Sequence, residues 1–259
     1  MNRQPAVAGA FYPANPDQLR IMLHQYLNEA ASSDKIPKAI IAPHAGYIYS
    51  GAIAASAYAR LTKARDRINR VVLIGPSHRV AFRGLSVSSA EAFVTPLGNI
   101  FVDQEAVQKI IHLPFVEYIE QAHTFEHSLE VQLPFLQEVL DNFTIVPIVA
   151  GDATPDQVDQ VLKALWGGDE TLIVISSDLS HYHDYATAQQ LDQSTTRMIE
   201  QLQYDQLNFD SACGRVPVSG LLKFAKEHSF NIKTIDLRNS GDTAGDKNRV
   251  VGYGAYVID

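Results

Sequence analysis

The sequence predicts an α/β fold, with a single domain and a central mixed or partly parallel sheet flanked by helices on both faces. Short segments that are apolar throughout alternate with longer segments whose apolar residues recur at helical spacing. Strands that are apolar on both faces need cover on both sides, which is typical of a sheet between two layers of helices. No linker, repeat or low-complexity tract divides the 259 residues, so we expect one domain over 1–259.

Each expected element has a local signal. Leu19, Leu23 and Leu27 share one face of the first helix, and Ser50 and Asp103 are suited to capping later helices. Apolar runs bounded by turn residues mark the strands, and the polar stretch 29–37 marks a loop. In chain order we expect a helix at 16–31, a strand at 38–42, a helix at 50–61, strands at 70–74 and 85–88, helices at 103–112 and 129–140, a strand at 143–149, a helix at 155–166, a strand at 171–176, helices at 185–201, 204–211 and 218–228, and strands at 232–237 and 250–258.

The composition argues against a nucleic-acid-binding or membrane protein. The net charge is −8 and no cluster of Lys and Arg stands out, although both nucleic acid and anionic lipid require a positive surface. No apolar run approaches the roughly 20 residues of a membrane helix, and the first residues lack the apolar core of a signal peptide. The single cysteine, Cys213, excludes an intrachain disulfide, which is typical of a reducing compartment. We therefore expect a cytoplasmic protein.

Two histidines follow apolar strands in matching settings. "IIAPHAGYIYSG" places His44 after Pro43, and "RVVLIGPSHRV" places His78 two residues after Pro76. A lone histidine at a strand end is usually structural, but two behind rigid proline turns are better suited to a shared site. In sheets of this class, sites lie beyond the carboxyl ends of the strands. Rigid placement is also what metal coordination requires, so both are candidate metal ligands.

The segment "SSDLSHYHD" follows a third apolar strand. Asp178 and His181 are its candidate catalytic residues, because a neutral histidine near a metal is a suitable general base. The alternative is an ordinary loop in which Asp178 caps a turn. A Ser-His-Asp triad remains open, but the chain contains no G-x-S-x-G motif that would support it.

The segment "AHTFEHSLEVQLPFL" contains His123, Glu126 and His127 in the H-x-x-E-H order of some zinc proteases. That motif requires a helix, which would place both histidines on one face. The apolar helical period begins only at Leu129, so we expect the histidines in a loop or first turn. Glu126, His127 and Glu130 stay candidate site residues, whereas the protease interpretation is disfavoured.

Cys213 lies in "SACGRVPVSG", before a glycine at a helix break. A single cysteine is most often a small buried hydrophobe. Joined to two histidines it would complete a His₂Cys set suited to Fe, Cu or Zn. It is also suited to a Cys–His nucleophile. The residues alone leave these three interpretations open.

Seven segments in order resemble the Memo family, whose bacterial and archaeal members are called AmmeMemoRadiSam system protein B. They span residues 3–257 and read "RQPAVAGAFYP", "IAPHAGYIYSG", "GPSH", "EHSLEVQLPFL", "SSDLSHY", "CGRVPVSG" and "VVGYGAYV". The resemblance implies a fold like that of the extradiol ring-cleaving dioxygenases. It also implies a transition metal ion on His44, His78 and Cys213, with His181 as the pocket base.

The resemblance implies further properties. The acidic motif of the family begins at Glu126, which leaves His123 outside it. The system name implies a radical SAM protein and an AMMECR1-like protein as partners. A thiolate replaces the carboxylate of non-haem iron oxygenases, so ring cleavage does not transfer directly to this chain.

Two classes of function remain open from the sequence. One is a metal-dependent redox enzyme for a small molecule or partner protein, in which His181 moves a proton and Asp178, Glu126 or His127 orients it. The other is a non-catalytic adaptor that binds metal or peptide in the same pocket. The presence of a base and an acid beside the expected ligands favours the enzyme.

Overall fold

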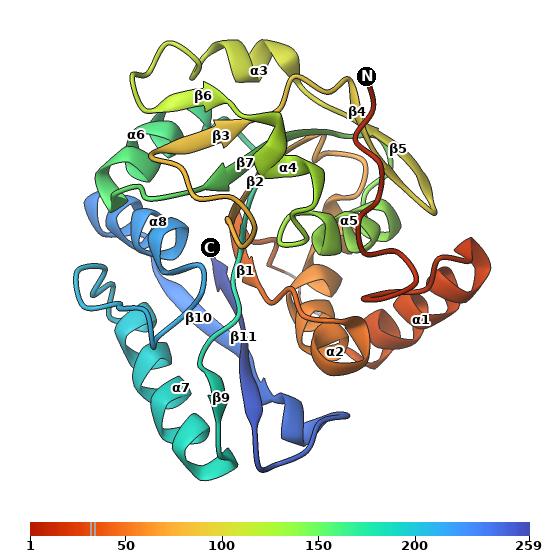
Figure 1. Ribbon diagram of the computed structural model, residues 1–259, viewed down its shortest axis with the longest axis vertical. Helices are drawn as coiled ribbons and strands as arrows, with labels where there is room; N and C mark the ends of the chain where they lie inside the picture. Colours follow the sequence, from red (N-terminus) through yellow and green to blue (C-terminus); the bar gives the residue numbers. More distant parts are fainter. Residues whose placement is uncertain (32, 34) are drawn as a thin grey trace.

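A mixed β-sheet forms the centre of the molecule in the computed structural model, which describes residues 1–31, 33 and 35–259 (Figure 1). Eight of its described strands lie in the order β10 (Ile232–Asn239), β11 (Val250–Ile258), β1 (Ala39–Ala42), β8 (Thr171–Ser176), β2 (Arg70–Pro76), β7 (Thr144–Ala150), β3 (Leu85–Val87) and β6 (Val116–Tyr118). The short strand β9 (His181–His183) pairs with β11. A separate hairpin joins β4 (Ala92–Thr95) and β5 (Gly98–Phe101).

The four central strands run parallel to one another. β1 pairs in parallel with β8, β8 with β2, and β2 with β7. In register, Ala42 of β1 lies opposite Ser176 of β8, and Ile74 of β2 lies opposite Ile175. The carboxyl ends of β1, β8 and β2 therefore reach the same edge of the sheet. The outer strands β11 and β3 run antiparallel to their inner neighbours, which makes the sheet mixed.

Helices cover both faces of the sheet, as the α/β prediction requires. In Figure 1, α1, α2 and α5 lie on one side of the central strands and α6, α7 and α8 on the other. The described α-helices are α1 (Pro16–Glu29), α2 (Tyr47–Tyr58), α3 (Gln104–Gln108), α4 (Glu120–Thr124), α5 (Leu133–Val139), α6 (Pro155–Leu165), α7 (Tyr185–Glu200) and α8 (Arg215–Glu227). The 3₁₀ helices are η1 (Ala59–Ala64), η2 (Glu130–Gln132) and η3 (Ser240–Asp242). No helix among the described residues is both long and apolar enough to span a bilayer.

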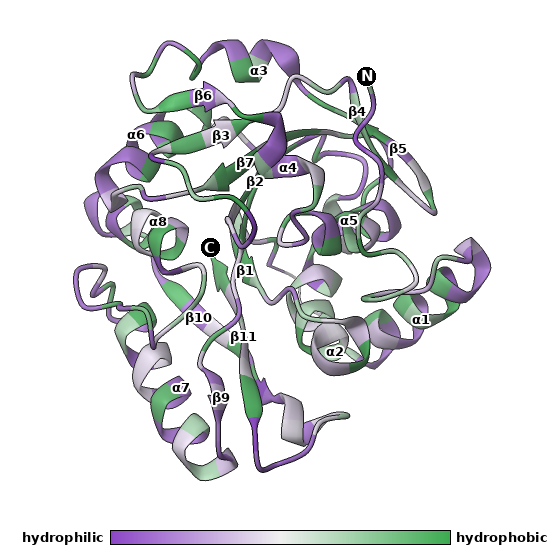
Figure 2. Cartoon of the chain, in the orientation of Figure 1, coloured by the Kyte–Doolittle hydropathy of each residue, from purple (hydrophilic) through white to green (hydrophobic). Residues whose placement is uncertain are grey.

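The core explains why the central strands are apolar on both faces. Every residue of β1 and β8 is buried, and Figure 2 shows apolar colouring concentrated in the central strands. Burying one Ile or Val side chain stabilises the fold by roughly 1.5–3 kcal/mol. Ile40, Ile173 and Val174 belong to the same buried cluster. The core therefore holds the strand ends, and whatever they carry, in fixed positions.

The sequence predicted the class and most elements correctly, and the structure corrects several boundaries. α2 begins at Tyr47 and not at Ser50, whose hydroxyl donates to the carbonyl of Ala45 (3.0 Å) and caps nothing. The predicted helix 129–140 starts as the 3₁₀ helix η2 and continues as α5. Asp103 does cap its helix by accepting from the amide of Ala106, but α3 ends four residues early. The predicted loop 29–37 lies partly outside the described residues.

The predicted helix at 204–211 is wrong. The segment folds as turns, and the side-chain oxygen of Asn208 accepts from the amides of Asp210 (2.9 Å) and Ser211 (3.2 Å). Asparagine favours such turns because its side chain satisfies the backbone donors that a helix would use. The segment therefore reaches α8 as an irregular loop, with Cys213 at its end.

Candidate metal centre

Three strand ends supply most of the polar residues at one edge of the sheet. β1 ends two residues before His44, β2 ends two residues before His78, and β8 ends two residues before Asp178. β8 lies between β1 and β2, so these residues meet around its carboxyl end. The placement matches the general rule for sites in sheets with parallel central strands.

His44 is buried and has one nitrogen free to bind a metal. Its Nδ1 lies 2.8 Å from the Ser176 hydroxyl, which gives its own proton to the carbonyl of Ser128 (2.6 Å). The hydroxyl also accepts from the side-chain amide of Gln132 (2.8 Å). Because its only proton goes to Ser128, it must accept from His44 as well. Nδ1 therefore carries the proton, and the lone pair of Nε2 faces the Cys213 sulfur at 3.3 Å. Burial, and then the neighbouring histidines, lowers the pKa of His44 and favours the neutral ring.

His78 is oriented by Glu126. Its Nδ1 lies 2.8 Å from Glu126 Oε1, and its backbone amide donates to Oε2 (2.6 Å). Glu126 also accepts from the amides of His127 and Ser128, both at 2.9 Å. Burial alone would raise the pKa of Glu126, but His78 and these amides lower it to about 2. The ionised carboxylate accepts the Nδ1 proton and leaves Nε2 of His78 free.

Cys213 lies in a tight turn against the end of β8. A Cβ on the next residue, Gly214, would come within 2.6 Å of Ser177 Cβ, so only glycine allows this approach. The sulfur accepts from the amide of Asp178 at 3.3 Å. Burial, and then the charge of Asp178, raises the pKa of the thiol, so it is protonated when no metal is bound. Metal binding would release that proton.

The three donor atoms fit one metal ion. The ligand atoms of His44, His78 and Cys213 lie within 4.8 Å of one another. The 3.3 Å separation of Sγ and Nε2 of His44 is close to the ~3.5 Å between two ligands of a tetrahedral ion with bonds of about 2.0–2.3 Å. In both histidines, a hydrogen bond at Nδ1 leaves the lone pair of Nε2 available for the metal, as is usual for histidine ligands. The chemistry of the donor set suits a transition metal.

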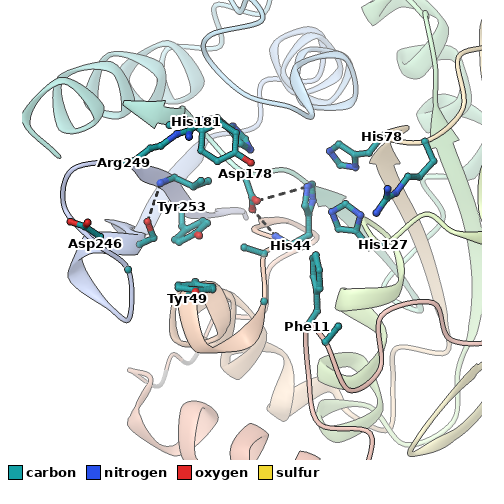
Figure 3. A pocket seen from close by; sticks show the side chains of 18 residues that line it. Phe11, His44, Tyr49, His78, His127, Asp178, His181, Asp246, Arg249 and Tyr253 are labelled. Carbon is teal, nitrogen blue, oxygen red and sulfur yellow. Dashed lines mark hydrogen bonds and ion pairs between the residues drawn. The ribbon is translucent and has the colours of Figure 1, made fainter. Parts of the chain in front are cut away.

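Asp178 and His181 lie next to these donors. Asp178 accepts from the backbone amide of His44 (2.7 Å), and its carboxylate lies 4.0 Å from the imidazole Nε2 (Figure 3). Burial raises the pKa of Asp178, although His181 and the His44 amide act in the opposite direction. His181 donates from Nδ1 to the carbonyl of Leu179 (2.8 Å). Its Nε2 is therefore free to accept a proton.

His127 packs inside the same site. Its ring stacks on His78 with centroids 4.6 Å apart, meets His44 edge-on at 5.5 Å and contacts Phe11 at 4.9 Å. Its Nδ1 is buried and has no hydrogen-bond partner among the described residues. Burial lowers the pKa of His127, with Glu126 opposing. A second group of possible ligands therefore consists of His78, Glu126 and His127.

A pocket of about 690 Å³ opens in front of His44, His78 and His181. The sequence did not single out its walls, because they come from segments far apart in the chain. In Figure 3 Tyr49 and Tyr253 lie across the cavity from His78 and His127, on the same side as His181. The wall residues that the sequence did not single out include Phe11, Tyr49, Arg79, Tyr182, Asp246, Arg249 and Tyr253.

Two further candidates lie away from the metal centre. His123 lies in the five-residue helix α4. Its Nε2 contacts the Ser86 hydroxyl (3.1 Å), and its ring meets the ring of Phe93 edge-on. Among the described residues it shares no group of possible metal ligands with His127, so the H-x-x-E-H arrangement is not formed. Glu130 is fully buried and binds the N-terminal segment.

Lowering the pH should destabilise the protein through His123. Its Nδ1 has no partner among the described residues, and burial, only partly offset by Glu120, lowers its pKa to about 4. The unfolded chain, with a pKa near 6.5, binds more protons between these values, so stability falls as the pH falls from about 6.5 to 4. The slope is at most about 1.4 kcal/mol per pH unit for this group. Urea unfolding at several pH values should show a shallower slope for His123→Gln, but not for the control His112→Gln at an exposed position.

Comparison with known proteins identifies the family. The model of the family described as "Memo-like protein" matches residues 3–257. The chain belongs to the Memo family. A MEMO1 family protein from Aquifex aeolicus is 37% identical, over 97% of both chains, and one from Methanosarcina barkeri is 37% identical, over 99% of this chain and 100% of the relative. The family assignment thus covers every segment of the candidate metal centre.

A solved structure shares the fold of this Memo-family chain. The crystal structure of the uncharacterized protein JW3007 from Escherichia coli K12 superposes with a TM-score of 0.55, covering 86% of this chain and 100% of the other. The sequence identity is 14%, so the likeness concerns the fold alone.

Proposed function

We propose that this Memo-family protein is a metal-dependent redox enzyme acting on a small molecule or on a partner protein. The observation that carries the proposal is the convergence of three donor atoms, the free ring nitrogens of His44 and His78 and the sulfur of Cys213, beside a pocket that also holds His181. A binding scaffold would need the ligands but not a histidine with a free Nε2 across the cavity.

The donor set limits the metal to Fe, Cu or Zn. Two imidazoles suit all three ions, and a thiolate shifts the preference toward Cu and Zn relative to the carboxylate of oxygenase sites. When bound, a redox-active ion would supply one-electron chemistry or polarise a substrate oxygen. We also propose a relation in fold to the extradiol ring-cleaving dioxygenases, with a different reaction because the thiolate replaces the carboxylate.

The residues of the chain divide the remaining work. Nε2 of His181 takes a proton from the substrate, while the hydrogen bond from Nδ1 to the carbonyl of Leu179 fixes the orientation of the ring. Asp178 holds both neighbouring ligands in place: its carboxylate accepts from the backbone amide of His44, and its own backbone amide donates to the sulfur of Cys213. Tyr49 and Tyr253 line the cavity in which the substrate would bind and limit its access to water.

The rival Cys–His nucleophile has less support. A nucleophilic cysteine needs a thiolate, which a positive neighbour stabilises. Burial raises the pKa of Cys213 and lowers that of His44, so the pair stays neutral in the absence of a metal. The same neutral pair is ready to bind a cation once the thiol proton leaves.

The partners of the protein remain part of the proposal. A radical SAM protein and an AMMECR1-like protein follow from the family resemblance alone. Their binding to this chain can be measured directly with the purified proteins.

Replacing His181 with Ala should separate catalysis from metal binding. Oxygen uptake by protein loaded with Fe(II) or Cu, measured with a panel of small redox substrates that includes but is not limited to catechols and aminophenols, should fall about 100- to 10,000-fold, because a positioned base contributes that much. The metal content, measured by mass spectrometry, should match that of the wild type, since His181 is not a ligand. An equal loss of metal would make His181 a ligand. No uptake by the wild type, even with each redox metal and reductant, would favour the adaptor.

A further inference from the structure

The N-terminal segment, residues 3–12, forms one wall of the metal pocket. Figure 1 shows it passing from the N-terminus beside α5 to α1. The carboxylate of Glu130, fully buried, binds it by accepting from the amides of Ala6 (2.7 Å) and Val7 (3.0 Å) and from the Tyr12 hydroxyl (2.6 Å). Phe11 of the same segment contacts the ring of His127. The segment is therefore held by Glu130 and contacts the site through Phe11.

Arg3 is the buried cation of this arrangement. Its guanidinium is paired with Glu130 and lies over the ring of Phe93. Its two other donors reach backbone carbonyls, Nε that of His123 (3.1 Å) and Nη2 that of Glu126 (2.6 Å). The planar fork of arginine makes these contacts together, whereas a lysine ammonium cannot reproduce them. Arg3 thus fixes both ends of the turn between His123 and Glu126.

That turn sets the position of the carboxylate that orients His78. Glu126 accepts from Nδ1 (2.8 Å) and from the backbone amide of His78 (2.6 Å). Both contacts depend on where the Glu126 backbone lies. Arg3 therefore holds the backbone of Glu126, and the carboxylate of Glu126 holds the ring of His78, whose Nε2 is the proposed ligand atom.

We propose that Arg3 is a positioning residue of the metal centre, which acts through Glu126 on His78. Its functional meaning rests on the proposed metal site, but its effect on Glu126 does not. Partners of this kind commonly change metal affinity by about 10- to 100-fold. The inference assigns to the N-terminal segment a role in the pocket beyond packing.

The test compares Arg3→Lys and Arg3→Gln in the full chain. Lysine keeps the charge on Glu130 paired but loses at least one carbonyl contact, so this variant should fold even if Arg3→Gln does not. In metal-free protein, the amides of His78, His127 and Ser128, which all donate to Glu126, should exchange with deuterium at least about 10-fold faster. The affinity for Co²⁺, followed by the sulfur-to-cobalt absorption band, should fall about 10- to 100-fold.

Arg70→Gln is the matched control. Arg70 pairs with Asp103 (2.6 Å) at the opposite end of β2, the strand that leads to His78. The substitution Arg70→Gln should leave the deuterium exchange of these amides and the affinity for Co²⁺ unchanged. Wild-type exchange and Co²⁺ affinity in a folded Arg3→Lys would overturn the inference. A wild type that binds no Co²⁺ would instead contradict the proposed metal site, while the exchange rates would still decide the role of Arg3.

Discussion

Replacing Cys213 with Ala should remove most of the transition metal from the purified protein, and His44→Ala should do the same. Each change deletes one of the three metal ligands. The affinity for the metal should therefore fall by more than the roughly 10- to 100-fold that is typical when a residue that only orients a ligand is replaced. Cys213 also supplies the only thiolate of the chain, so its loss should abolish the sulfur-to-cobalt band of Co²⁺-loaded protein. Mass spectrometry of metal after dialysis measures the first effect and absorption spectroscopy the second.

His123→Ala is the control for this series. His123 contacts Ser86 and Phe93 away from the pocket, so its loss should leave the metal content unchanged. A protein that keeps its metal without Cys213 and loses it without His123 would restore the H-x-x-E-H interpretation. Retention in all three variants would place the metal on the second group, His78, Glu126 and His127.

The sequence predicted the central strands of the sheet well because the pattern that marks each of them lies within a few consecutive residues. β8 and β11 have the predicted bounds, since runs such as "TLIVIS" are apolar on both faces and end at polar turns. The short strands β4, β5, β6 and β9 were missed. They have only three or four residues each, and β4 also pairs with Arg3, far away in the chain. Such pairing depends on tertiary contacts that a local pattern does not contain.

The residues of the candidate site also fall into two groups, those marked by a local sequence pattern and those placed by contacts between distant parts of the chain. His44, His78 and His181 could be predicted because each follows a strand end, and the fold brings those ends together. Glu126 was predicted only as a site residue, and its hydrogen bond to His78 spans 48 residues. Arg3 was not predicted at all, because its partners Glu126 and Glu130 lie more than 120 residues away. Only family-level resemblance placed Cys213 with the histidines.

Replacing Glu130 with Gln should destabilise the protein by about 3–5 kcal/mol, because removing one partner of a buried ion pair leaves an uncompensated charge. The carboxylate is fully buried and binds Arg3, two backbone amides and the Tyr12 hydroxyl. Glutamine keeps the shape and one acceptor oxygen, but its NH2 group would face two of the donors that the carboxylate accepts from, so the loss combines the missing charge with these lost hydrogen bonds. The free energy of unfolding from urea titration of metal-free protein measures it.

Glu138→Gln provides the matched control with the same substitution. Glu138, whose own side chain is 11% exposed, pairs with Arg20 and, when that histidine is protonated, with His24; these partner side chains are 49% and 59% exposed. Ion pairs of this kind contribute about 0–1 kcal/mol, so the control should lose no more than that. The double variant Arg3→Gln/Glu130→Gln leaves no unpaired charge and should therefore be less destabilised than the sum of its two single variants. Additive losses would mean that Arg3 and Glu130 stabilise the N-terminal segment independently, through their backbone contacts and not through their charges.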